Sequence, residues 1–291
     1  MRNGIKTIIV VLLLSTFMVS CSIYDKYPGH RQCDISLELA DSTGAVLPDS
    51  IAHLYSINWF VDGIYQHTVA ADADGKYRVS FDSGDRITFV AMAASDTSEC
   101  VANSPVLGES IKNTWLQMKT SSNIPSPQPH TIYYGKLDVV PQDDDTLSKN
   151  YTILMKDVRA KFRVLIKGLK SRFGDGNYRI VVEGLRTGIA YDGSSTGEQV
   201  NYSINGAFNS DGNYITLPYS VFPTKEGERV RILVYKQDGT LLFDHDTDDN
   251  GIPLVLKRYD DVVFVITASY QAQLTITIVP WADIDNPVSF Q

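Results

Sequence analysis

Hydrophobic and polar positions alternate with a period of two along most of this chain. The segments 35–39, 76–81 and 158–169 show the pattern clearly. Successive side chains of a strand point to opposite faces, so the alternation predicts strands with one buried face. In the last segment it places Val158, Phe162, Val164 and Ile166 on one side. Further strands are expected at 54–61, 86–92, 132–140, 151–156, 178–183, 200–208, 214–222, 230–235, 241–244, 252–256, 262–269 and 274–279.

Turn signals separate these strands at short intervals. Asp-Gly pairs at 62–63, 211–212 and 238–239 favour tight hairpin turns. The segment 95–129 shows little alternation, so we expect a long connection there with one helical turn around 111–118. No run has the period of a capped helix. The pattern predicts an all-β protein built of antiparallel sandwiches.

The chain is long enough for two such sandwiches. We place their boundary near Asp157, which gives an N-terminal β-sandwich domain at 35–157 and a C-terminal one at 158–291. The second half repeats the strand pattern of the first. A single large β-domain is the alternative.

The first 24 residues predict export and lipid attachment. Arg2 and Lys6 precede the uncharged apolar run 7–20, and Cys21 follows it, which is the pattern of a secretory signal. The run is short for a membrane span, which needs about 20 apolar residues. Because residues 18–21 resemble a bacterial lipobox, we expect a signal peptide at 1–20. A lipidated Cys21 with a tether is then expected at 21–34. An ordinary signal peptide or an N-terminal membrane anchor are the alternatives.

Charge and cysteines narrow the picture further. The net charge of −8 argues against a nucleic-acid partner, because phosphate binding needs a basic face. Once Cys21 carries lipid, Cys33 and Cys100 remain, and an exported chain favours a disulfide between them. Two free thiols are the alternative. The sequence holds no Cys/His cluster with metal-ligand spacing, and we expect no cofactor.

Two polar motifs offer candidate chemistry. The run 193–197 matches the G-x-S-x-G nucleophile pattern on Ser195, but its flanks predict strands and only His245 follows it. A Gly/Ser-rich hairpin loop is therefore preferred. Asp246, Asp248 and Asn250 have the spacing that opens a calcium loop, yet Lys257 stands where a bidentate Glu is needed. An acidic hairpin loop is preferred, with weak calcium binding as the lesser candidate.

Aromatic residues offer a third candidate site. Tyr133, Tyr134 and Trp115 could form a platform for sugar rings, although aromatic residues of a sandwich more often lie in its core. Trp281 is expected to pack at the end of the last strand. The sequence supports no catalytic site, and we do not expect an enzyme.

Several segments together resemble the FimB-type fimbrial anchor lipoproteins associated with fimbrillin (type V) pili. The likeness covers most of the mature chain. It is carried by Cys21–Asp25 with the nearby Cys33, and by 57–63, 76–81, 83–91, 158–169, 230–235, 238–239 and 279–281.

The resemblance implies two transthyretin-like sandwiches on a tether that is lipid-anchored to the outer membrane and exposed at the cell surface. It also implies a non-catalytic pilus anchor or minor accessory subunit, joined to pilin subunits by β-strand addition. The alternative function is a surface glycan-binding lipoprotein of a polysaccharide-uptake system.

Overall fold

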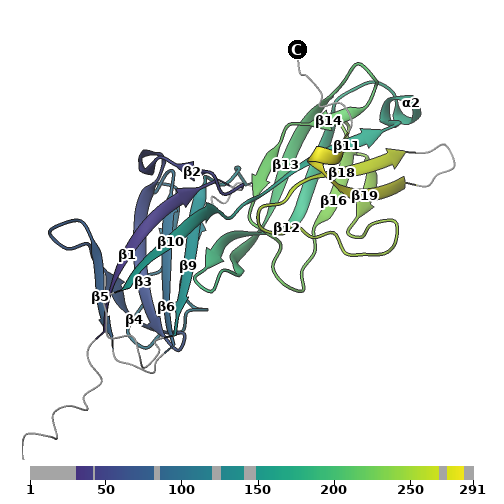
Figure 1. Cartoon of the computed structure of the whole chain (residues 1–291). Coiled ribbons are helices and arrows are strands. Elements are labelled where there is room, and N and C mark those ends of the chain that lie inside the picture. The colour runs from purple at the N-terminus through teal and green to yellow at the C-terminus, as the bar shows by residue number, and fades with distance from the viewer. Residues whose placement is uncertain are drawn as a thin grey trace, which may run out of the picture.

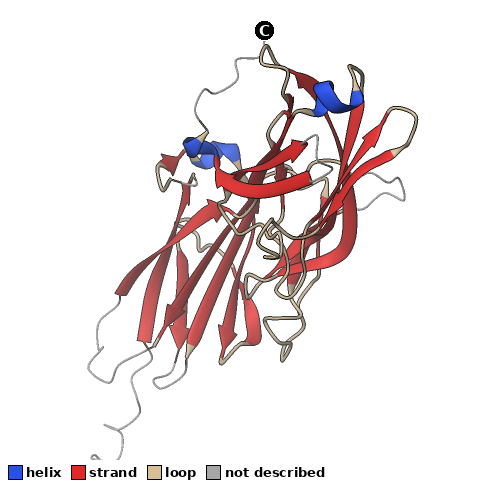
Figure 2. Cartoon of the chain, turned by 90° about the vertical axis from the view of Figure 1, so that its right-hand side faces the viewer, coloured by secondary structure: helices blue, strands red, loops and turns tan. Residues whose placement is uncertain are grey.

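The computed structural model describes residues 31–41, 43–81, 86–119, 126–140, 149–268 and 274–284. Regular structure in these ranges is almost entirely β-strand, in two sheets that follow one another along the molecule (Figures 1 and 2). The all-β prediction is therefore confirmed. No helix within the described ranges is long and apolar enough to cross a membrane. Cys21 lies outside the described residues.

The first sheet has the order β2-β1-β10-β9-β6-β3-β4, and β5 also pairs with β1. All its pairings are antiparallel except that of β1 with β10, which is parallel. The short 3₁₀ helix η2 (Asp49–Ile51) follows β2. The strands are β1 (Arg31–Ala40), β2 (Val46–Leu47), β3 (His53–Val61), β4 (Ile64–Val69), β5 (Tyr77–Phe81), β6 (Ile87–Ala94), β9 (Ile132–Val139) and β10 (Lys149–Asp157).

Sequence alternation decides which face of the first sheet is buried. Ile35 and Leu39 of β1 point into a hydrophobic cluster, the first-sheet core, together with Val79 and Phe81 of β5. The turn from β3 to β4 is the expected Asp-Gly pair, in which Asp62 has φ 49° and the following glycine φ 77°. A two-residue hairpin of this type needs positive φ at both positions.

The second sheet contains two layers that pack face to face. Its order is β17-β16-β12-β13-β14-β11-β18-β19, and the long strand β13 belongs to both layers, since it pairs with β12 and then with β14. The elements are β11 (Ala160–Lys167), α2 (Leu169–Phe173), β12 (Tyr178–Ala190), β13 (Ser195–Phe208), β14 (Tyr214–Thr216), β15 (Tyr219–Val221), β16 (Arg231–Lys236), β17 (Leu241–His245), β18 (Asp261–Ala268), β19 (Leu274–Pro280) and the 3₁₀ helix η3 (Trp281–Asp283).

Apolar side chains from both layers fill the space between them, which we call the second-sheet core. β11 contributes Phe162, Val164 and Ile166 to this core, as the alternation predicted. Leu254 and Leu256 also enter the core, from the loop between β17 and β18. This loop was expected to contain a strand at 252–256. The structure gives it an alternating burial pattern without a sheet ladder.

The segment 95–129 departs from its prediction. It forms a hairpin of β7 (Cys100–Ala102) and β8 (Trp115–Met118), so the expected helical turn around 111–118 is wrong. β8 pairs with the end of β12, which belongs to the second sheet. After returning to the first sheet at β9, the chain crosses to the second sheet again between Asp157 and Ala160. The hairpin therefore ties the two sheets together across the expected boundary, and the division into two domains stays a prediction.

A hydrophobic cluster joins the two sheets, and we call it the junction cluster. It explains why β6 is apolar almost throughout, since alternate residues of β6 face the first-sheet core and the junction cluster. Its buried members are Phe60, Tyr65, Val90, Met92, Ala94, Cys100, Leu116, Met118, Ile132, Tyr134, Val158, Ile189, Tyr191 and Phe222.

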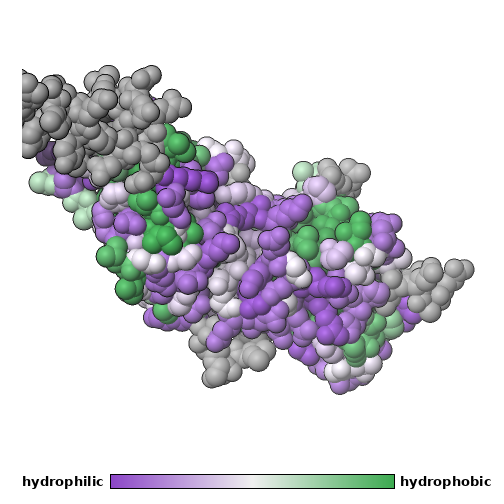
Figure 3. Space-filling view, turned by 90° about the horizontal axis from the view of Figure 1, so that it is seen from below, coloured by the Kyte–Doolittle hydropathy of each residue, from purple (hydrophilic) through white to green (hydrophobic). Residues whose placement is uncertain are grey.

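The surface seen from below is mostly hydrophilic (Figure 3). Its hydrophobic patches are small and are separated by polar side chains. This face therefore shows no broad apolar area for docking, which leaves strand edges and clefts as the candidate binding sites.

Candidate functional site at the free edge of strand β19

β19 is the last strand in the order of the second sheet. It pairs with β18 from Leu274 to Pro280, without a bulge, and within the described residues it has no strand on its other side. An edge strand presents backbone N–H and C=O groups that another chain can pair with. Only alternate residues of β19 direct these groups outward.

A contact with Asp249 shows which residues of β19 point outward. The N–H of Ile276 donates to Asp249 Oδ1 at 2.6 Å, and the N–H of Asp249 donates to the carbonyl oxygen of Ile276 at 3.1 Å. The backbone groups of Ile276 therefore point away from β18. Because these groups alternate along a strand, those of Ile278 point outward as well.

The free edge contains one position that is open and one that cannot donate. Among the described residues, none forms a hydrogen bond with the N–H or C=O of Ile278 on this side. Pro280 occupies the next outward position and has no N–H, which is typical of edge strands. Within the described part of the chain, the outward backbone of β19 is thus capped by Asp249 at Ile276 and open at Ile278.

The residues of the calcium candidate lie in the acidic loop that precedes β18, where they bond to other groups of the protein. Asp246 forms an ion pair with Arg229 at 3.2 Å. Asp248 Oδ1 accepts hydrogen bonds from the N–H groups of Asn250 at 2.9 Å and Ile252 at 2.8 Å. Within the described residues, no group of three or more His, Cys, Asp or Glu side chains is arranged to hold a metal ion. Asp246 and Asp248 thus hold the acidic loop together through their own contacts, and weak calcium binding by this loop stays a prediction.

The outer face of β11 and β18 is covered near the end of β19. The guanidinium of Arg163 lies 3.7 Å from the ring centre of Trp281 and also pairs with Asp261 at 2.6 Å. Trp281 packs there against the buried side chains of Leu165 and Val263. This tryptophan therefore packs against the sheet near the last strand, as expected.

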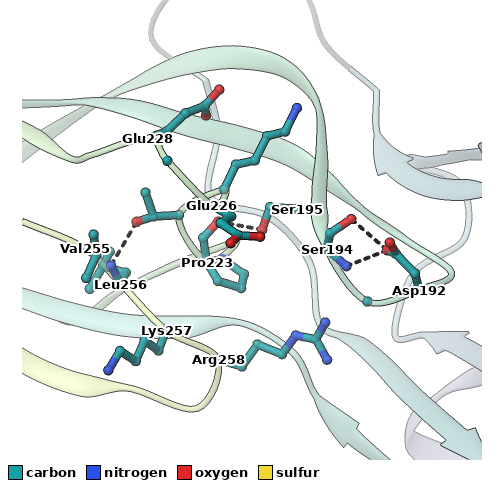
Figure 4. Close-up of a pocket in the computed structure, with 14 residues that line it drawn as sticks. Asp192, Ser194, Ser195, Pro223, Glu226, Glu228, Val255, Leu256, Lys257 and Arg258 are labelled. Carbon is teal, nitrogen blue, oxygen red and sulfur yellow. Dashed lines mark hydrogen bonds between the residues drawn. The ribbon is translucent and has the colours of Figure 1, made fainter. Parts of the chain in front are cut away.

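Ser195 lies in a cleft of about 470 Å³ next to the loop 223–228 (Figure 4). Its side chain is buried, and its hydroxyl donates to the carbonyl oxygen of Pro223 at 2.7 Å. Among the described residues that line the cleft, none is a histidine. Ser195 also begins a strand rather than standing on a strand-to-helix elbow. Its hydroxyl is a structural donor, bonded to a backbone carbonyl rather than to a general base.

The aromatic platform expected from Tyr133 and Tyr134 is not exposed. The two residues are 7% and 6% exposed, and the hydroxyl of Tyr134 donates to the carbonyl oxygen of Tyr191 at 3.1 Å. Trp115 is half-buried in β8. The tyrosines belong to the hydrophobic cores. They do not form the exposed aromatic surface on which the glycan-binding prediction relied.

The expected disulfide is also absent. Cys33 and Cys100 are both free and buried, 1% and 6% exposed. Cys33 lies in the first-sheet core and Cys100 in the junction cluster, and these clusters lie on opposite faces of β6. Each thiol is enclosed by its own apolar surroundings. Burial raises the pKa of each thiol to about 11.

These thiols are expected to be present but unreactive in the folded chain. At pH 8 about one in a thousand would be ionised, and the thiolate is the reactive form. In a Cys21→Ser chain without reductant, Ellman's reagent should titrate two thiols after denaturation and almost none before it. Finding none after denaturation would show that Cys33 and Cys100 are bonded.

Comparison with known proteins identifies the family. Residues 60–286 match the family described as fimbrillin-A associated anchor proteins Mfa1 and Mfa2. The chain belongs to this family. Among curated proteins, none matches the sequence. The family resemblance seen in the sequence is thus confirmed, and this member of the Mfa2 family is a pilus-associated protein of the cell envelope. Fimbrial anchors are in general not enzymes.

Solved structures share the fold of this Mfa2 family member. The fimbrial anchor protein Mfa2 of Porphyromonas gingivalis has a TM-score of 0.59, 13% identity, and coverage of 87% of this chain and 98% of that one. A Bacteroides thetaiotaomicron protein proposed to bind polysaccharides has a TM-score of 0.58, 14% identity, and coverage of 86% and 98%. A proposed adhesin of Bacteroides ovatus has a TM-score of 0.54, 13% identity, and coverage of 89% and 96%. At these identities the likeness shows the fold alone.

Sequence reasoning found β19 and the acidic loop but not the contact between them. Asp249 was read only as part of an acidic run, and Ile278 only as part of a strand. The available signal was Pro280, which marks β19 as an edge strand because it cannot donate to a neighbour. The cap at Ile276 depends on how a loop 27 residues away folds back, so no local pattern predicts it.

Proposed function

We propose that this Mfa2 family member is a lipid-anchored pilus anchor at the outer membrane that takes up a fimbrial subunit by β-strand addition at the free edge of β19. The observation that carries the proposal is the outward backbone of Ile278, which has no hydrogen-bond partner among the described residues on that edge. The family match supports the pilus partner. An anchor must bind its subunit at a surface that lies away from the membrane tether.

The edge has the features that strand addition uses. In this mode backbone hydrogen bonds supply affinity, and alternate side chains supply specificity. Ile276 and Ile278 direct their side chains toward the second-sheet core, so an added strand would extend that layer. Asp249 now bonds to Ile276 with one donor and one acceptor, as a strand would. An incoming strand would take over that position.

The N-terminal end of the described chain and the free edge of β19 suit an anchor because they belong to different sheets. The chain enters the described structure at Arg31, in the first sheet, and β19 belongs to the second. Acylation at Cys21 would hold the first sheet near the bilayer. Acyl chains contribute about 0.8 kcal/mol per buried CH₂, so more than one chain gives stable attachment.

A proline at position 278 is expected to abolish capture of the fimbrial subunit. Ile278→Pro removes an N–H that faces outward and leaves the pairing of β19 with β18 unchanged, as Pro280 already does. The variant, carrying an affinity tag, would be extracted from native outer membranes in mild detergent. Proteins that co-purify with it would then be identified by mass spectrometry.

The matched control is Ile278→Ala, which loses the side chain but keeps the N–H. Capture by the alanine variant and none by the proline variant would support backbone pairing. Equal capture by both would overturn the proposed edge. The same fractionation tests the tether, because a Cys21→Ala chain should leave the membrane fraction. If it remains there, lipid attachment at Cys21 is wrong.

A further inference from the structure

β1 is held along its whole length by its neighbours in the first sheet. It pairs in parallel with β10 at eight consecutive positions, from Cys33 with Lys149 to Ala40 with Lys156. Side chains add to this ladder, since the hydroxyls of Ser36 and Thr152 lie 2.8 Å apart. The ladder has no register shift, so the two strands are bonded continuously.

The two strands enter and leave the sheet at opposite ends. The N-terminal segment joins β1 at Arg31, and β10 ends at Asp157, from which the chain reaches β11 of the second sheet at Ala160. Because β1 and β10 are parallel, Arg31 lies at the end of the ladder away from Asp157. Figure 1 shows β1 and β10 side by side. Tension between the N-terminus and the second sheet therefore pulls the two strands lengthwise in opposite directions.

Lengthwise tension loads all the hydrogen bonds of a ladder together, whereas tension across one end opens them one pair at a time. The other edge of β1 resists in the same way. β5 pairs with it from Arg31 to Ile35, and β2 pairs with it at Leu39 and Ala40. Buried side chains of β1 would also have to slide through the first-sheet core, among them Cys33 and Ile35.

We propose that β1 and β10 act as a mechanical clamp that transmits tension from the N-terminal tether to the second sheet. The inference rests on the proposed anchor function, because only an anchored chain is pulled from its N-terminus. The junction cluster and the hairpin of β7 and β8 connect the sheets a second time. Whichever connection carries the tension, β1 is the strand that the tether pulls.

Single-molecule force spectroscopy on the full chain tests the clamp. In one geometry, handles at the two termini load β1 and β10 in shear. In the other, handles at the N-terminus and on Asn150→Cys pull apart the ends of the two strands where Asp34 pairs with Asn150. The rupture force of the event that opens the first sheet should be severalfold higher in the first geometry, because forced unfolding follows the unfolding barrier.

A disulfide between the strands is the matched control. Ser36→Cys with Thr152→Cys replaces two side chains that already touch, in the same paired register. Pulled from its termini, the oxidised chain should lose the event that opens the first sheet, and reduction should restore it. Equal forces in the two geometries, or an event unchanged by oxidation, would overturn the clamp. No fimbrial subunit or lipid takes part, so a failure here is distinct from a failure of the proposed function.

Discussion

Replacing Tyr191 with alanine is expected to lower the free energy of unfolding by about 3–5 kcal/mol, the usual cost of emptying a buried aromatic site. Tyr191 is 1% exposed and packs edge-on against Phe60, with ring centres 6.2 Å apart. Phe60 comes from the first sheet, and Tyr191 follows β12 of the second sheet. The cavity would therefore open in the cluster that joins the two sheets.

Urea denaturation followed by tryptophan fluorescence would measure the loss, and Tyr191→Phe is the control. The hydroxyl of Tyr191 lies 3.2 Å from that of Ser56, so its removal should cost about 1 kcal/mol. If alanine and phenylalanine destabilise the chain equally, the ring does not join the sheets. A small loss for both would contradict the packing described for the junction cluster.

Gly184→Ala is expected to lower the free energy of unfolding by about 3 kcal/mol or more, since it adds a steric clash to a left-handed backbone. Gly184 has φ +85° and lies where β12 shifts its register against β13. A Cβ placed there would overlap the carbonyl oxygen of Arg229, which is backbone and cannot turn aside. Equilibrium denaturation would measure the effect.

Gly212→Ala separates the two causes. Gly212 has a similar φ of +74°, but a Cβ at this position would meet nothing within 4 Å. In this control the free energy of unfolding should fall only by the cost of placing alanine in a left-handed backbone, about 1 kcal/mol. Equal losses at Gly184 and Gly212 would show that the approach of Arg229 is not tight.

The candidate site was only partly predictable. The strand at 274–279 and the acidic loop before β18 follow from residue types, and the family resemblance indicated strand addition. Which residue of the strand is open could not be predicted, because Asp249 reaches Ile276 only in the folded chain. The open position at Ile278 follows from that contact and from the alternation of backbone groups.

The sequence by itself determined the all-β class, the buried face of strands such as β1 and β11, and turns such as the Asp-Gly pair at Asp62. These features depend on near neighbours, because alternation and turn chemistry act within a few residues. Tertiary structure decided that β8 pairs with β12, that Cys33 and Cys100 lie on opposite faces of β6, and that β1 pairs in parallel with β10. Alternation determines which face of a strand is buried but not which strand pairs with it. Pairings between distant segments are therefore decided only when the whole chain packs.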